Sequence, residues 1–121
     1  MPGAAHGNWR TAIERAWRTH ATETLPGRCV AFAVHHGLKP MRVRVRDQRS
    51  RWGACSARGA ITLNWRLVQM PDAVADYVML HELAHLRQPN HSRRFWREVE
   101  SLCPTWRASE RWLKTFGREL L

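Results

Sequence analysis

The stretch best suited to chemistry is His81-Glu82-Leu83-Ala84-His85, which has the pattern H-E-x-x-H. On a helix each residue advances by about 100°, so side chains four positions apart point in nearly the same direction. His81 and His85 can therefore bind one metal ion, while Glu82 beside them can accept a proton from a water molecule at that metal. His91 follows six residues later and is the expected third ligand. Three protein ligands leave the fourth position open, as a hydrolytic zinc site requires.

The alternative interpretation is a polar helix face with incidental histidines, and the flanking residues argue against it. Residues 71–80 begin with Pro and Asp, which suit a helix start, and apolar residues cover nearly every face of the helix that follows. Ionisable groups inside such a buried helix need partners, which a metal supplies. Pro89 prevents the helix from continuing and Asn90 favours a turn. That turn is predicted to return His91 toward the other two histidines, just before a helix over residues 92–102 that Ser92 caps.

Composition predicts a small globular protein with one domain over residues 1–121. The chain is 44% hydrophobic and contains seven tryptophans, enough for a single core. Residues 1–7 lack the apolar segment of a signal peptide, and no apolar run is long enough to span a membrane. Cys29, Cys55 and Cys103 are odd in number and have no paired C-x-x-C spacing, which favours reduced thiols and a cytoplasmic location. The alternative is that Cys55 or Cys103 is instead a metal ligand.

Hydrophobic periodicity predicts the element order α-α-β-β-β-α-α-α. A first helix is expected from Asn8 to about Thr22, with Trp9, Ala12, Ile13, Ala16 and Trp17 on one face. Residues 25–27 contain Pro and Gly and should end it, and a second helix is predicted over 29–36 with Gly37 as its cap. Strands are predicted over 41–47, 51–56 and 60–65, with a hairpin turn at 57–59, and a last helix over 105–120. The expected fold class is α+β, with a short antiparallel sheet packed on a central H-E-x-x-H helix and flanking helices.

The charge balance raises a second possibility, binding to nucleic acid. The net charge is +10, and eighteen of the twenty basic residues are arginines. Such a balance attracts polyanions. In the strand at 41–47, alternation places Val43 and Val45 toward the core and puts arginines on the other face. The basic patch, with one aromatic beside it, comprises Arg42, Arg44, Arg46, Arg49, Arg51 and Trp52. Such residues can contact phosphates of DNA or RNA and stack on a base, although a solvated sheet face explains the pattern equally well.

Two separated parts of the sequence resemble one family. Residues 50–56 (SRWGACS) and 63–67 (LNWRL) resemble the signature that precedes the active helix in YgjP-like metallopeptidases. The H-E-x-x-H segment, followed by residues 90–92 (NHS) and by Phe95-Trp96, resembles that family's metal segment. The resemblance runs from about residue 41 to 96 and implies a small zincin fold related to the SprT-like proteases. It implies one zinc ion on His81, His85 and His91, with Glu82 as catalytic base. Members commonly carry an additional N-terminal β-rich segment that this chain largely lacks.

The leading hypothesis is therefore a cytoplasmic zinc peptidase acting on polypeptides, with one hairpin strand available to pair with an extended substrate. Glu82 would take the proton of the attacking water and pass it to the leaving amine. Tyr77 lies one turn before His81 and is a candidate to stabilise the transition state, or else to pack against a ligand. Two other hypotheses are a nucleic-acid-binding module with a structural zinc and an inactive zincin that serves as an interaction domain. A structural zinc normally has four protein ligands, and the sequence shows three.

Overall fold

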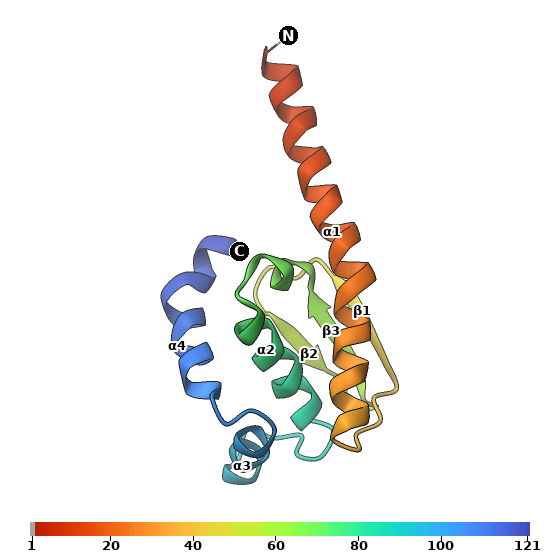
Figure 1. Cartoon of the computed structure of the whole chain (residues 1–121), viewed down its shortest axis with the longest axis vertical. Coiled ribbons are helices and arrows are strands. Elements are labelled where there is room, and N and C mark those ends of the chain that lie inside the picture. The colour runs from red at the N-terminus through yellow and green to blue at the C-terminus, as the bar shows by residue number, and fades with distance from the viewer. Residues whose placement is uncertain (1) are drawn as a thin grey trace.

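The computed structural model describes the backbone of residues 2–121 and the side chains of residues 9–121. The elements follow one another as α1 (Pro2–His35), β1 (Arg42–Arg46), β2 (Gly53–Cys55), β3 (Ala60–Asn64), the 3-10 helix η1 (Trp65–Gln69), α2 (Asp72–Ala84), α3 (Arg93–Leu102), α4 (Trp106–Phe116) and the 3-10 helix η2 (Gly117–Leu120). The first half of α1 extends away from the rest of the chain (Figure 1). The predicted α+β class is confirmed, and Ser92 caps α3 as expected by accepting a hydrogen bond from the backbone of Phe95.

The sheet is mixed, whereas an antiparallel sheet was expected. Its strand order is β1-β3-β2. The hairpin of β2 and β3 is antiparallel and turns through Gly59, whose φ of +88° favours glycine. β1, however, pairs with β3 in parallel, because the loop between β1 and β2 crosses the end of β3. The fully buried Asn64 holds that loop, since its Nδ2 donates to the carbonyl oxygens of Gln48 at 2.7 Å and Arg51 at 3.0 Å.

The loop is also tied to α1 and η1 through one carboxylate. Asp47 follows β1 and accepts hydrogen bonds from Arg66 at 2.7 Å, from Arg18 at 2.9 Å and from the Trp65 indole at 3.3 Å. The hydrogen bond from Arg66 is the largest cause of a lowered pKa of Asp47. These contacts make the crossover a fixed part of the fold, so the position of β2 beside β3 is well defined.

α1 is one continuous helix, so the predicted break at Pro26 was wrong. Pro26 lies inside the helix, although proline removes one helical hydrogen bond. Buried residues recur every four positions on both sides of it, namely Ala21, Leu25, Cys29 and Ala33. Packing of this stripe against the body offsets the lost bond. The helix ends as predicted near Gly37, which has a φ of +69°. The side chain of Asn8, the predicted cap, lies outside the described residues, and its backbone is already helical.

The apolar face predicted for residues 9–17 is exposed in the described part of the chain. Trp9, Ile13 and Trp17 are 66%, 40% and 38% exposed, because this half of α1 extends past the sheet. The stripe that joins the core begins only at Ala21. Among the described residues, none of the helices has the length and apolar character needed to span a membrane.

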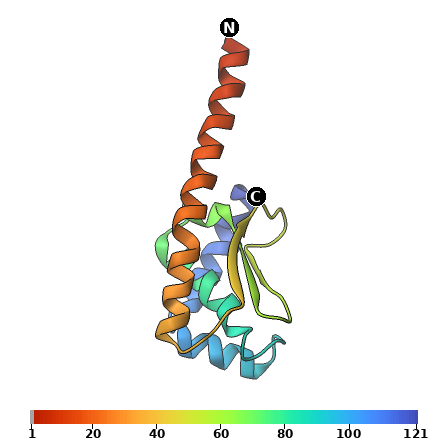
Figure 2. The ribbon, with the colours of Figure 1, turned by 90° about the vertical axis from the view of Figure 1, so that its right-hand side faces the viewer.

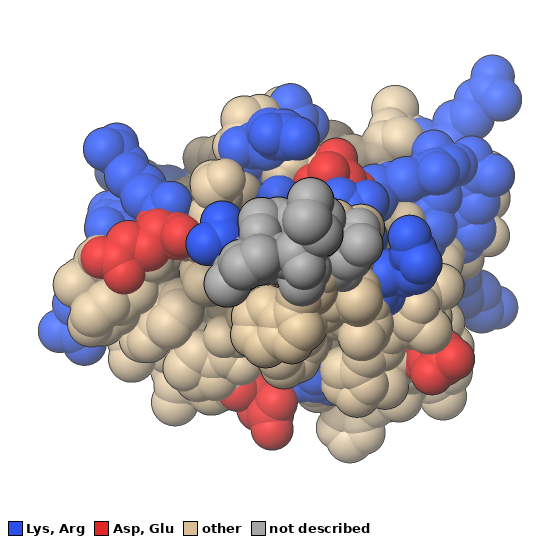
Figure 3. All heavy atoms as spheres, turned by 90° about the horizontal axis from the view of Figure 1, so that it is seen from above, with Lys and Arg blue, Asp and Glu red and all other residues tan. Residues whose placement is uncertain are grey.

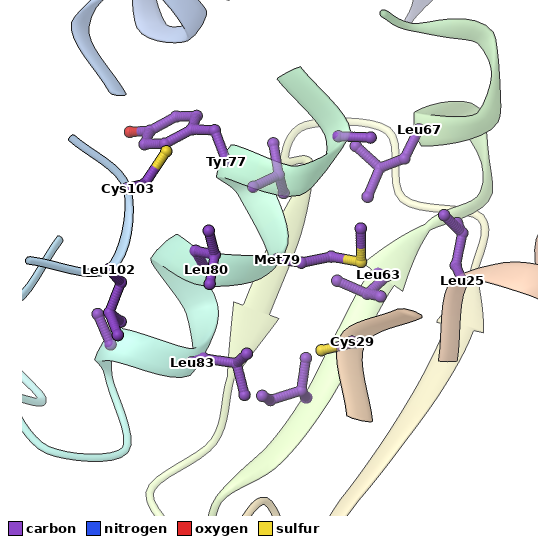
Figure 4. Packing of buried hydrophobic residues seen from close by; sticks show 14 of the residues in the cluster. Leu25, Cys29, Leu63, Leu67, Tyr77, Met79, Leu80, Leu83, Leu102 and Cys103 are labelled. Atoms are coloured by element: carbon purple, nitrogen blue, oxygen red, sulfur yellow. The ribbon is translucent and has the colours of Figure 1, made fainter. Parts of the chain in front are cut away.

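α2 is the central helix of the fold. Together with α1 it covers one face of the sheet, which Figure 2 shows almost edge-on. Met79 and Leu83 point toward the layer that holds Leu63 of β3 and Cys29 of α1, while the opposite side of α2 faces the segment joining α3 and α4 (Figure 4). This burial on nearly every face matches the prediction from its sequence and gives the metal motif a rigid support.

Candidate functional site

The three histidines singled out by their spacing lie together at the end of α2. Their potential ligand atoms all lie within 4.8 Å of one another. The Nε2 atoms of His85 and His91 are 3.1 Å apart. Nitrogens bound to one tetrahedral zinc at 2.0–2.1 Å are separated by about 3.3 Å, so this donor set fits zinc. His81 and Glu82 belong to the last turn of α2, His85 is its C-cap residue, and His91 lies in the loop before α3.

The turn after α2 orients the His85 ring. Nδ1 of His85 lies 3.1 Å from the carbonyl oxygen of Gln88, a contact in which Nδ1–H donates and the lone pair of Nε2 is left for a metal. Burial lowers the pKa of His85, which favours the neutral imidazole that metals bind. The same turn leads to His91, so one short segment both ends the helix and supplies the third candidate ligand.

Two aromatic residues of α3 hold the histidine rings. Phe95 is fully buried and stacks on His85, with ring centroids 4.3 Å apart. Trp96 is stacked on His91 at 6.2 Å. Both aromatics also contact His81 edge-on, at 5.0 Å and 5.9 Å. Because α3 packs against α2, these contacts restrict the rotamers of the three histidine side chains.

Glu82 is only 6% exposed and lies against the backbone of β2. Its Oε2 is 3.2 Å from Nδ1 of His81. A Cβ added to Gly53 would lie 2.8 Å from Cγ of Glu82 and 3.1 Å from its Oε2, so a glycine is required where the strand meets the carboxylate. The sequence contained a signal for this contact, because an isolated glycine in a strand often marks a close approach.

Two cavities lie beside the candidate metal site, and residues of β2 line both. One of about 360 Å³ includes Gly53, His81 and Glu82 in its lining. The other, of about 690 Å³, includes Cys55 and His85. β2 is an edge strand, since the sheet order places it beside β3 alone. β2 therefore has a free edge with one cavity at its Gly53 end and the other at its Cys55 end, and we refer to this edge and the two cavities together as the cleft.

Tyr77 lies beside His81, and its hydroxyl already has a hydrogen-bond partner. Its ring meets His81 edge-on at 5.8 Å, and its hydroxyl donates to Oε2 of Glu110 at 2.6 Å. Burial, followed by this hydrogen bond, raises the pKa of Tyr77, so the hydroxyl stays protonated. Glu110 was not identified from the sequence because it is 33 residues from Tyr77 and belongs to no local motif.

The predicted basic patch is divided between two places. Arg42, Arg44 and Arg46 lie on β1, with Val43 and Val45 between them packed against the core. Arg51 and Trp52 instead line the smaller cavity beside Glu82. Trp52 also packs on the C-terminal segment, since a Cβ at Gly117 would lie 3.1 Å from its ring. The aromatic ring is therefore part of the cleft wall and does not extend the arginine row.

The cysteines lie outside the group of side chains that could hold a metal ion. Cys29, Cys55 and Cys103 are all free. Burial raises the pKa of Cys29 to about 12 and that of Cys55 to about 11, with Glu82 adding to both shifts. Burial also raises the pKa of Cys103. Among the described residues, the side chains close enough together to hold one metal ion are the three histidines, so no cysteine belongs to the candidate donor set.

Comparisons with known proteins agree with this geometry. The family model described as YgjP-like, metallopeptidase domain, matches residues 2–116. The crystal structure of the metallopeptidase zymogen of Pyrococcus abyssi abylysin is similar to this chain, with a TM-score of 0.62 and 31% sequence identity. The similarity covers 76% of this chain and 94% of that one. A search of curated proteins finds no match. Because the family model covers nearly the whole sequence, the chain belongs to the YgjP-like metallopeptidase family.

Proposed function

We propose that this protein is a zinc-dependent peptidase that uses His81, His85 and His91 as metal ligands and Glu82 as general base. The convergence of three imidazoles beside a buried carboxylate at a cleft wall is the observation that carries the proposal. Zinc bound there would polarise the scissile carbonyl and lower the pKa of a water molecule to about 7. Family membership supports hydrolysis of a polypeptide as the reaction class.

Residues of the chain would carry out proton transfer, substrate binding and orientation of the metal ligands. Glu82 would accept the proton of the attacking water and deliver it to the leaving amine, and its burial against Gly53 keeps its carboxylate in place. The free edge of β2 would bind an extended substrate through backbone hydrogen bonds. Tyr77 is assigned to orienting His81, because its hydroxyl donates to Glu110 and would have to leave that partner to stabilise a transition state.

The test of this proposal is zinc-dependent cleavage. Protein stripped with a chelator is expected to leave an unfolded protein substrate intact, and to cleave it once about one equivalent of zinc per chain is restored. Elemental analysis would give the zinc content, and mass spectrometry would give the cleavage products. Cleavage that is equally fast before and after stripping would contradict the proposal.

We also propose that the protein works in a reducing, cytoplasmic setting. All three cysteines are free thiols, and a reducing compartment keeps thiols in this state.

A second candidate activity, sequence-independent binding of DNA or RNA, is favoured by the arginine row on β1. Among the described residues no helix covers the sheet face opposite α1 and α2 (Figure 2). Lys and Arg side chains cover much of the upper part of the view from above (Figure 3). Arg42 and Arg46 lower the pKa of Arg44, which shows how closely these charges are crowded. Nε of Arg44 is buried with no hydrogen-bond partner in the described part of the chain. Alternate strand residues are about 6.8 Å apart, so the row offers regularly spaced contacts to phosphates.

Replacing Arg42, Arg44 and Arg46 by glutamine is expected to weaken nucleic-acid binding and to flatten its salt dependence. Each lost phosphate contact changes the slope of log affinity against log salt by about 0.7–0.9, so three would change it by about 2–3. Fluorescence anisotropy with labelled single- and double-stranded DNA would measure the slope. The matched control replaces Arg97, Arg111 and Arg118, three exposed arginines outside the row, and removes the same charge. Equal weakening by both triple variants would show a general charge effect and refute a defined surface.

A further inference from the structure

The two cavities beside the metal ligands differ in charge. The cavity on the Glu82 side contains two carboxylates, Glu82 and Glu110, and two cations, Arg51 and Lys114. The cavity on the His85 side contains three cations, Lys39, Arg58 and Arg87, and none of the described residues lining it is acidic. A substrate lying along β2 would therefore meet balanced charge at one end of the cleft and uncompensated positive charge at the other.

The three cations come from separate segments that the fold brings to one rim. Arg87 follows α2 and is held in place by the backbone carbonyl of His36 at 2.9 Å and by Glu98 at 3.2 Å. Glu98 offsets much of the charge of Arg87, so Arg87 contributes mainly a fixed part of the cavity lining. Arg58 is at the hairpin turn between β2 and β3. A backbone hydrogen bond of 2.8 Å from Met41 to Gly59 brings the segment containing Lys39 alongside that turn.

Lys39 and Arg58 supply the uncompensated charge. Both side chains are exposed, and within the described part of the chain no carboxylate forms an ion pair with either of them. The cavity volume of about 690 Å³ is within the range of small-molecule sites and exceeds the needs of one side chain. An anionic group entering this space would have two cations available and no competing acid in its lining.

We propose that the cavity on the His85 side is a subsite for an acidic side chain of the polypeptide substrate, so that the protein selects Glu or Asp on one side of the scissile bond. The proposal rests on the proposed function, since it takes the cleft along β2 as the substrate site. The balanced cavity on the Glu82 side makes no such selection. Lys39 and Arg58 are specificity-determining residues in this scheme and take no part in the chemical step.

The test uses peptides whose register in the cleft is set by a zinc-chelating hydroxamate group. A peptide with a C-terminal hydroxamate extends to one side of the metal, and a peptide with an N-terminal hydroxamate extends to the other. Each series contains a Glu peptide and its Gln isostere, with the substitution two or three residues from the chelating group. Binding to the zinc-loaded protein is measured by quenching of tryptophan fluorescence at low and high salt.

In one series only, the Glu peptide is expected to bind about fivefold more tightly than the Gln peptide at low salt, since two exposed ion pairs contribute modestly. High salt should reduce the difference. Lys39→Gln combined with Arg58→Gln should abolish it. Arg97→Gln combined with Arg111→Gln removes the same charge from exposed positions outside both cavities and should leave it intact.

A Glu preference of equal size in both series would show general attraction to a basic protein and would overturn the proposal. A Glu preference that survives in the Lys39 and Arg58 double variant would also overturn the proposal. The same holds if neither peptide series binds the protein. If only the proposed peptidase function fails, the result would be different. The Glu preference would still appear in one hydroxamate series, but the protein would cleave no peptide.

Discussion

Glu82→Gln is expected to keep zinc and fold while lowering the turnover number for peptide hydrolysis by about 10²- to 10⁴-fold, the usual contribution of general acid–base catalysis. Glutamine is nearly isosteric with glutamate, so the close packing against Gly53 is preserved. What is lost is the carboxylate that accepts the proton of the water molecule. Because the change removes a step of the reaction rather than a substrate contact, KM should change little.

The experiment compares parent and variant on an unfolded protein substrate, with the zinc content of each sample measured. Glu100→Gln is a matched control, because Glu100 is exposed and pairs with Arg107 outside the cleft. Equal turnover by the zinc-loaded Glu82 variant and the parent would exclude Glu82 as the base. If the zinc-loaded parent itself cleaves no substrate, the hypothesis of an inactive zincin that serves as an interaction domain gains support.

The features that sequence predicted well depend on short separations along the chain. The three histidines span eleven residues, and helix periodicity with a proline-directed turn is enough to bring them together. The cap at Ser92 and the positive φ of Gly59 are equally local. For such features, neighbouring residues carry nearly all of the information.

The features that sequence missed depend on distant partners. The helix continues through Pro26 because residues on both sides pack into a core formed by the rest of the chain. The parallel pairing of β1 with β3 depends on the buried amide of Asn64, which holds a loop that precedes it. Tyr77 and Glu110, or Glu82 and Gly53, come together only when α4 and β2 pack on α2. Periodicity within one segment cannot indicate contacts of this kind.

The difference between local features and distant contacts also explains which part of the basic patch was predicted correctly. Alternation correctly places Arg42, Arg44 and Arg46 on one face of β1, since side-chain direction in a strand is a local property. The positions of Arg51 and Trp52 depend on how the crossover loop meets the C-terminal segment, which the strand pattern does not encode. The charged rim of the His85 cavity is likewise assembled from three segments far apart in the sequence.

His91→Ala is expected to lower zinc affinity by more than about 100-fold, which exceeds the typical 10- to 100-fold loss when only a partner of a ligand is removed. His91 supplies one of three candidate nitrogens and is the only one of them from outside the end of α2. Its loss leaves two donors, and it also removes the bond that would tie the loop before α3 to the metal. The fold should persist, because the side chain of His91 is exposed and Phe95 remains buried against His85.

Competition against a chromophoric zinc chelator would measure this change in affinity. His20→Ala is the matched control, since His20 is an exposed histidine of α1 outside the site. Removing a ligand should shift the competition curve to much lower chelator concentration, whereas the control should overlay the parent. A His91 variant that resists the chelator as well as the parent does would mean that another donor completes the site. The first donor to examine would then be Glu82, because its Oε2 lies 3.2 Å from Nδ1 of His81. The general base would then need a new assignment, so this single variant tests the ligand set and the catalytic scheme together.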